Sequence, residues 1–136
     1  MSGETNLAVL LKSMNPILRD EEYVFCSVDP HNNNYLKLDP ICIFREDEGL
    51  TLIVQRDRAD AADMSYSSVF RMVTLSIHSS LDAVGFLATI TSKLAEYGIS
   101  VNPVSAYYHD HLFVPAARAG EVMKLLREFS TDRANV

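Results

Sequence analysis

The segment HSSLDAVGFLATITSKLAEYGIS (78–100) holds the residues best suited to binding a small anion. Its apolar residues recur at steps of three and four, at Leu87, Ile90, Leu94 and Tyr97. This spacing predicts a helix over 81–97 with one buried face. Gly85 lies in the first turns of that helix, where glycine costs roughly 1 kcal/mol relative to alanine. A residue without Cβ suits a place where a ligand or another backbone comes close.

The start of this helix resembles a capping box, with Ser79 three residues before Asp82, and Gly98 fits the position just past its end. A helix N-terminus exposes unpaired N–H groups and the positive end of the helix dipole, so the 78–86 turn is a candidate anion site. Two other interpretations stay open. Gly85 would also permit tight helix–sheet packing, and Asp82 would also stabilise a helix start without any ligand.

Asp110 lies between His109 and His111 in the sequence. Together with His78, these residues could suggest a metal site. Spacing this loose is weak support for a tetrahedral site, so we expect surface or loop-capping histidines and no metal. The neighbouring Tyr107 and Tyr108 could line a ligand pocket, or alternate between core and water as strand residues do.

Acidic residues gather at Glu46, Asp47 and Glu48, with Asp57 nearby. A solvated turn is the ordinary interpretation, and a ligand binding there would carry a cationic group. The sequence contains no G-x-S-x-G motif, phosphate-binding glycine loop or zinc spacing. Nothing in it argues for catalysis, so we expect a protein that is not an enzyme.

The chain has 136 residues, of which 48% are hydrophobic and 22% charged, with a net charge of −6. These values indicate an ordinary globular protein with no basic stripe for nucleic acid. Cys26 and Cys42 lie in apolar runs, which favours buried free thiols. No run approaches the ~20 apolar residues that span a membrane, and the N-terminus is unlike a signal peptide. We therefore expect a cytoplasmic location without a membrane partner.

Patterning predicts alternating helices and strands along the whole chain. The expected helices begin with a short one through Leu7, Leu10, Leu11 and Met14 that stops before Pro16, and continue at 56–64, 81–97 and around Val122, Leu125, Leu126 and Phe129. The expected strands are 22–28, a hairpin of 41–46 with 50–55, 67–77, and a pair of 99–108 with 111–116. A turn-dense loop is expected over 29–40.

The two halves of the chain resemble each other in sequence. Residues 6–14 align with 85–93, and 52–64 align with 112–124, which matches Arg58-Ala59 to Arg118-Ala119. Asn6 then takes the place of Gly85, which suggests that the first repeat has lost a glycine-dependent site. We interpret this resemblance as an internal duplication whose element order is a shifted form of β-α-β-β-α-β.

Residues 74–115 resemble an ACT domain, the small regulatory module of aspartokinases and related enzymes. The resemblance rests on the strand 75–77, the turn 79–82, Gly85, and Leu94 followed by YGISV (97–101). It departs from many ACT domains, which carry proline-glycine where this chain has Val84-Gly85. The resemblance implies an α+β fold of two ferredoxin-like repeats, 1–66 and 67–136, each an antiparallel sheet with its helices on one face. The strand 67–77 is the seam between them.

The same resemblance implies a regulatory protein that binds a free amino acid and needs no cofactor. The carboxylate would sit at the 78–86 turn and the ammonium group against Asp82 or Asp110, at an interface between repeats or subunits. The expected ligand-binding residues are His78, Ser79, Ser80, Asp82, Val84, Gly85, Phe86, Tyr107 and Asp110.

A homodimer is expected, because ACT sheets commonly join edge to edge, and an unknown enzyme is a possible regulated partner. An alternative is an interaction module that docks on a partner without any small ligand. A third is an enzyme with a cryptic site, because ferredoxin-like folds host many activities.

Overall fold

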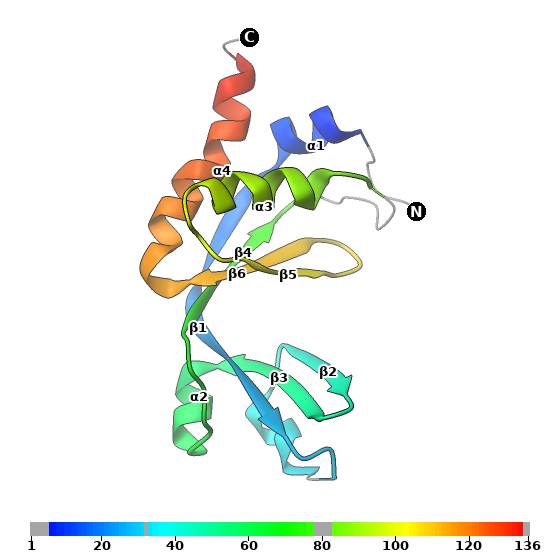
Figure 1. Cartoon of the computed structure of the whole chain (residues 1–136), viewed down its shortest axis with the longest axis vertical. Coiled ribbons are helices and arrows are strands. Elements are labelled where there is room, and N and C mark those ends of the chain that lie inside the picture. The colour runs from blue at the N-terminus through cyan, green and yellow to red at the C-terminus, as the bar shows by residue number, and fades with distance from the viewer. Residues whose placement is uncertain (1–5, 32, 78–82, 135–136) are drawn as a thin grey trace. The chain divides into compact units, whose positions relative to one another are not determined.

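The computed structural model of the chain describes residues 6–31, 33–77 and 83–134 (Figure 1). Helices and strands alternate along it in an α+β arrangement. In chain order they are α1 (Leu7–Ser13), β1 (Pro16–Val28), the 3₁₀ helix η1 (Asn33–Leu38), β2 (Cys42–Glu46), β3 (Gly49–Gln55), α2 (Arg56–Ala61), β4 (Phe70–Leu75), α3 (Phe86–Glu96), β5 (Asn102–Ser105), β6 (Asp110–Pro115), the 3₁₀ helix η2 (Ala116–Arg118) and α4 (Ala119–Ala134).

The chain forms two compact units that are interleaved in sequence. Unit 1 joins Met1–Arg19 to Arg71–Val136, as far as these are described, and unit 2 is Asp20–Phe70. The hydrogen-bonded strand order is β2-β3-β1-β4-β6-β5, and β1 contributes its first residues to unit 1 and the rest to unit 2. The division of the sequence repeats at residue 66 stays a prediction, and it differs from this division into compact units.

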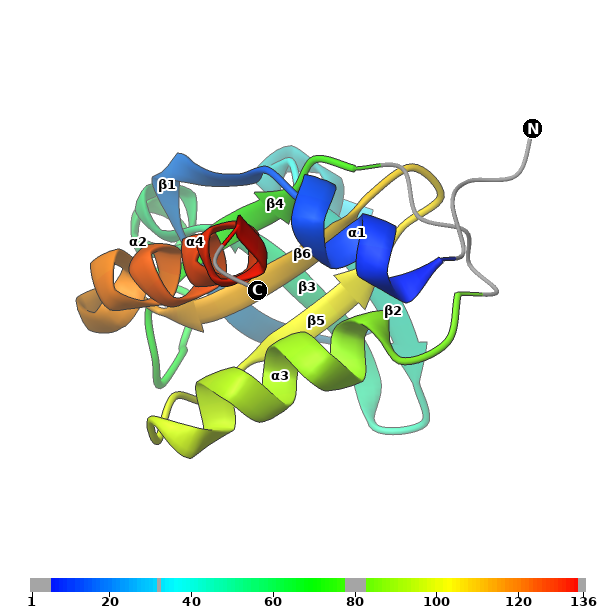
Figure 2. The same cartoon turned by 90° about the horizontal axis from the view of Figure 1, so that it is seen from above.

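Unit 1 is a ferredoxin-like layer of helices on one face of a sheet. The sheet contains the start of β1, then β4, β6 and β5. α1, α3 and α4 lie on the same side of these strands (Figures 1 and 2). Alternation along β4 and β6 sends one set of side chains toward the helices. The buried core beneath the helices contains Leu10, Leu11, Met14, Val73, Leu75, Phe86, Ile90, Leu94, Ile99, Leu112, Val114, Val122, Leu125 and Leu126.

Helix α3 confirms the predicted periodicity but not both of its predicted limits. It begins at Phe86 rather than at residue 81, so Gly85 precedes the helix instead of lying inside it. Its end is as expected, because Gly98 follows the helix with a left-handed backbone at φ 69°. The Gly98 N–H donates a hydrogen bond to Ala95 O (2.9 Å), and the Ile99 N–H donates one to Leu94 O (3.1 Å). These two bonds form a Schellman motif.

The predicted buried face of α3 is right at Ile90 and Leu94, which are fully buried, while Leu87 packs partly buried against the core. Tyr97 was expected on that face and is 48% exposed. The reason is that Tyr97 is the C-cap residue, where the backbone leaves the helix and the 3.6-residue period no longer applies.

Unit 2 is built on a three-strand antiparallel sheet. β3 pairs with β1, with Phe25 opposite Ile53, and with β2, with Phe44 opposite Thr51, so the predicted hairpin is confirmed. Its core is small and contains Val24, Cys26, Leu52, Val54 and Ala59. The sequence missed the 3₁₀ helix η1 within the predicted 29–40 loop.

The remaining element predictions agree with the structure to within a few residues. The short helices α1 and α2, the β5–β6 pair and the final helix α4 are all present, and β1 extends back to Pro16 beyond its predicted start. Both cysteines are free thiols, Cys26 buried and Cys42 partly buried. None of the described helices is long and apolar enough to cross a bilayer.

Candidate functional site: the α3 N-terminus

Gly85 is required at the α3 N-terminus by its backbone conformation. It is the N-cap residue of α3, at φ 86° and ψ −8°, in the left-handed region that side-chain-bearing residues rarely adopt. A Cβ built on it would meet only a methyl group of Leu7, at 3.6 Å, which is an ordinary contact. Close helix–sheet packing therefore does not explain this glycine, whereas the chain direction into α3 does.

The N-cap residue of α3, Gly85, makes no side-chain cap hydrogen bond. The first intrahelical bond runs from Thr89 N–H to Gly85 O (2.9 Å), so the preceding N–H groups have no partner within the helix. Gly85 has no side chain with which to cap the helix, and the first turn of α3 contains no acidic residue. The eleven-residue helix thus presents backbone donors and its positive dipole end without a carboxylate of its own.

The β5–β6 turn lies at the same end of unit 1 as the α3 N-terminus (Figures 1 and 2). His109 Nδ1 is 3.4 Å from the carbonyl oxygen of Ile77, and the carbonyl can only accept, so the ring nitrogen donates. A second bond, from Ala106 N–H to His109 O (3.0 Å), closes the turn itself. The turn is therefore fixed beside the point where the chain leaves β4 toward α3.

The predicted ligand-binding residues separate into three groups. His78, Ser79, Ser80 and Asp82 lie outside the described residues. Val84 is 84% exposed beside Gly85, while the side chain of Phe86 is buried in the core, so Phe86 offers a ligand only its backbone. Tyr107 and Asp110 lie on and beside the β5–β6 turn.

Tyr107 and Tyr108 pack against each other, with ring centroids 4.9 Å apart and an angle of 74° between the ring planes. Both rings are more than half exposed, so neither faces the core as strand alternation had suggested. Asp110 is the first residue of β6 and is only 7% exposed. Asp110 is therefore a buried acidic residue at the end of the β5–β6 turn.

In the described residues no group of three histidine, cysteine or acidic side chains is arranged to hold a metal ion. His109 and His111 instead contact Ile77 O and Thr74 Oγ1. The acidic residues of the β2–β3 turn are exposed, and Glu46 accepts a hydrogen bond from Thr51 Oγ1. This is the solvated turn that the sequence favours.

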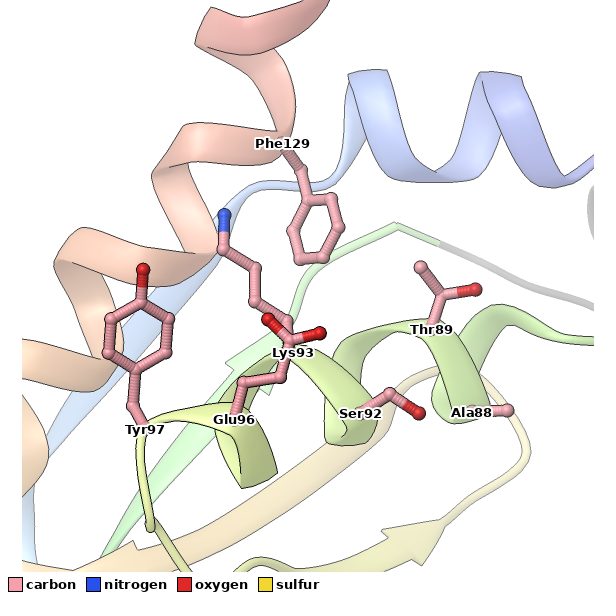
Figure 3. Close-up of a pocket in the computed structure, with 7 residues that line it drawn as sticks. All are labelled: Ala88, Thr89, Ser92, Lys93, Glu96, Tyr97 and Phe129. Atoms are coloured by element: carbon pink, nitrogen blue, oxygen red, sulfur yellow. The ribbon is translucent and has the colours of Figure 1, made fainter.

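The sequence did not predict an open pocket of about 600 Å³ along α3, shown in Figure 3. It is lined by Ala88, Thr89, Ser92, Lys93, Glu96, Tyr97 and, from α4, Phe129. Lys93 Nζ lies 2.9 Å from Glu128 Oε1 and 4.5 Å from the Phe129 ring centroid. The outward-facing residues of α3 gave no chemical signal, because a polar helix face normally faces water.

Two family models match the chain, both described as ACT domain, at residues 2–71 and 67–128. The layered α+β units and the glycine-started helix agree with these matches, and the chain belongs to the ACT domain family, with two such domains in tandem.

Solved structures give the same fold. A Vibrio cholerae protein of unknown function, described as a possible transport protein, is 45% identical over 91% of this chain and 95% of its own (TM-score 0.84). An Agrobacterium tumefaciens protein is 19% identical over 86% and 89% (TM-score 0.73). The regulatory subunit of aspartate kinase from Thermus thermophilus is 11% identical over 83% and 94% (TM-score 0.60). A comparison with curated proteins gives no match.

Proposed function

We propose that this protein is a cytoplasmic regulatory protein that binds a free amino acid and has no catalytic activity of its own. The observation that carries the proposal is the α3 N-terminus, where the N-cap residue is Gly85 at φ 86°, which has no side chain to cap the helix. Family membership supports a regulatory role, because a structural neighbour is a regulatory subunit of aspartate kinase.

The proposed ligand lies with its α-carboxylate at the N–H groups that follow Gly85. These donors and the helix dipole both favour a negative charge there. Its ammonium group would need an acceptor, and the residues proposed for that role are Asp82 and Asp110. The β5–β6 turn with Tyr107 borders the same end of unit 1 and would contact the ligand side chain.

A regulatory response requires more than binding, because a ligand shifts an equilibrium only when it prefers one arrangement of the protein. A second copy of the chain is the proposed partner of that change. β2 is an edge strand of the sheet and exposes Ile43 and Phe44, and Ile41 just before it is exposed as well. An exposed edge of this kind can pair with another strand. The same surface supports the alternative function, an interaction module that docks without a ligand.

A thermal-shift screen of the purified chain against the twenty amino acids tests the proposal. A ligand at a hundred times its dissociation constant adds about 2.7 kcal/mol to the free energy of unfolding, which raises the melting temperature by roughly 9 °C in a chain of this size. We expect a selective shift for one amino acid or a related pair. A folded sample that responds to none of them would leave the interaction module as the better proposal.

Variants at Gly85 separate the site from the fold. Gly85→Asn keeps a residue that tolerates left-handed backbone, so we expect a folded protein that loses the shift. Gly85→Leu should lose the shift and also melt earlier. Gly120→Ala, in α4 with nothing within 4 Å of the added Cβ, is the matched control and should keep the full response. An unchanged affinity in Gly85→Asn would overturn the site assignment.

A further inference from the structure

A row of three polar side chains crosses the sheet of unit 1 on the face away from its helices. Arg19 Nε donates to Thr74 Oγ1 (3.1 Å), and the same oxygen lies 3.1 Å from His111 Nδ1. The three residues come from β1, β4 and β6, which are adjacent in the sheet. Their sequence neighbours Leu18, Val73, Leu75 and Leu112 pack in the helix-side core, so alternation places this row on the opposite face.

The hydrogen bonds of this row fit a neutral His111. Arg19 Nε donates its one hydrogen to Thr74 Oγ1, which leaves the Thr74 hydroxyl with its own hydrogen and a second lone pair. A neutral His111 with its proton on Nε2 accepts that hydrogen at Nδ1, and an imidazolium would instead donate Nδ1–H to the second lone pair. Burial lowers the pKa of His111, the charges of His109 and Arg19 lower it further, and Asp110 opposes them, which agrees with a neutral ring.

Arg19 is the cation of this row, in a chain that is acidic as a whole. In the part of the chain that the structure describes, no carboxylate lies within 4 Å of the Arg19 guanidinium. Arg71 donates from Nε and Nη2 to the carbonyl oxygen of Arg19 (2.9 and 2.6 Å), but strand alternation gives Arg71 the face of Val73 and Leu75 rather than that of the row. The side chain of Thr74 is 1% exposed, so the row is anchored in packed protein while Arg19 is exposed.

We propose that Arg19 and His111, held in register by Thr74, form a binding site for a small oxyanion, a carboxylate or a phosphate. The Nη groups of Arg19 and the Nε2–H of His111 are donors that the row itself does not use. A guanidinium offers two parallel N–H groups that match the two oxygens of an oxyanion, and such charge-assisted bonds are the strong ones. This site shares no residue with the α3 N-terminus, so it does not depend on the proposed amino-acid site.

Protonation of His111 and binding of the anion are coupled at this site. A negative charge beside His111 favours the imidazolium, so the bound anion raises the pKa of His111 and affinity rises as the pH falls. The charged groups near the ring that enter this balance are Arg19, His109 and Asp110. The coupling gives a signature that a purely structural hydrogen-bonded row would lack.

Calorimetric titration of the full chain with inorganic phosphate, and separately with acetate, at pH 6 and pH 8 tests the site. We expect saturable binding that is tighter at pH 6, and the better of the two anions identifies the oxyanion class. Arg19→Gln should weaken binding about tenfold or more, because a hydrogen bond to a charged group is lost. Arg45→Gln, an exposed arginine on β2, is the matched control and should bind as the parent does.

His111 ring resonances followed by NMR give a second readout that does not depend on affinity. We expect the His111 pKa to rise when the anion is added, and Thr74→Val to weaken both the binding and this rise. Circular dichroism and melting curves establish that each variant is folded. The proposal is overturned if the parent binds neither anion saturably, if Arg19→Gln binds like Arg45→Gln, or if the His111 pKa is insensitive to the anion.

Discussion

Asn6 and Gly85 are both N-cap residues, of α1 and of α3, but only Asn6 caps its helix with its own side chain. Asn6 Oδ1 accepts the N–H of Val9 (3.2 Å) from an extended backbone. Gly85 has no side chain to do so and is left-handed. The internal alignment matched these two residues, and each is the N-cap of its helix. Asn6 uses its side chain to bind a helix N–H group, whereas Gly85 has no side chain that could compete with a ligand for the N–H groups of α3.

Replacing Asn6 by alanine removes the cap of α1. We expect the free energy of unfolding to fall by about 1 kcal/mol, as for N-cap losses in general, and Asn6→Gly to lose only a few tenths. Denaturant melts of both variants measure the difference. Equal losses in the two variants would mean that the Asn6 side chain does not act through the cap.

Gly120→Ala should stabilise the protein. Gly120 lies in the first turn of α4 with an ordinary helical backbone, and its added Cβ meets nothing within 4 Å. Alanine then gains about 0.5 to 1 kcal/mol from lower backbone entropy in the unfolded chain. Denaturant melts at pH 7 should show this gain, and a loss of stability would contradict the open space around this position.

Arg118→Lys should destabilise the end of α3. The Arg118 guanidinium donates to Gly98 O (3.0 Å) and Tyr97 O (2.9 Å) while also binding Glu121. Lysine keeps the charge but not the fork that reaches both carbonyls, so we expect a loss of about 1 kcal/mol. Glu121→Gln is the control, because it removes the exposed ion pair, which contributes about 0 to 1 kcal/mol, and leaves both carbonyl contacts.

The stability of the protein should fall as the pH drops below the ordinary histidine value of about 6.5. The folded state holds the pKa of His111 below that value, so the unfolded state binds more protons in this window and stability rises with pH through it. Unfolding melts between pH 5.5 and 7.5 should show a smaller slope in His111→Gln than in the parent.

Lys93→Met tests the α3–α4 contact of Figure 3. The ammonium group pairs with Glu128 and lies over the Phe129 ring, and only a sixth of the Lys93 side chain is exposed, 17%. Methionine keeps the apolar stem and removes the charge, so we expect a modest loss of about 0.5 to 1 kcal/mol. High salt should narrow the gap between parent and variant, and a gap that salt leaves unchanged would point to packing instead.

The amphipathic helices and strands could be predicted from the sequence, because an element with one buried face must carry apolar residues at the spacing of that element. Ile90 and Leu94 marked the face of α3 correctly, yet the pattern could not mark the start of the helix. Ser79 and Asp82 fit a capping box in composition, whereas the observed start is set by the backbone of Gly85. A single glycine with a left-handed backbone does not change the hydrophobic periodicity, so the pattern does not reveal where the helix begins.

The row across the sheet could not be predicted in the same way. Thr74 is 55 residues from Arg19 and 37 from His111, so only the strand order brings them together. In the sequence His111 could be interpreted only beside His109, and that pair favoured surface or loop-capping histidines over a metal site. Its contact with a buried threonine depends on the register of strands that are distant along the chain.

Strand β1 belongs to both compact units, which limits where the chain can be cut. Its first residues complete the sheet of unit 1, and α1 before it supplies Leu10, Leu11 and Met14 to the same core. A cut at residue 66 would separate α1 and the first residues of β1 from the rest of unit 1, and with them Leu10, Leu11 and Met14 from its core. The residues that fill this core therefore come from both sides of the predicted repeat boundary.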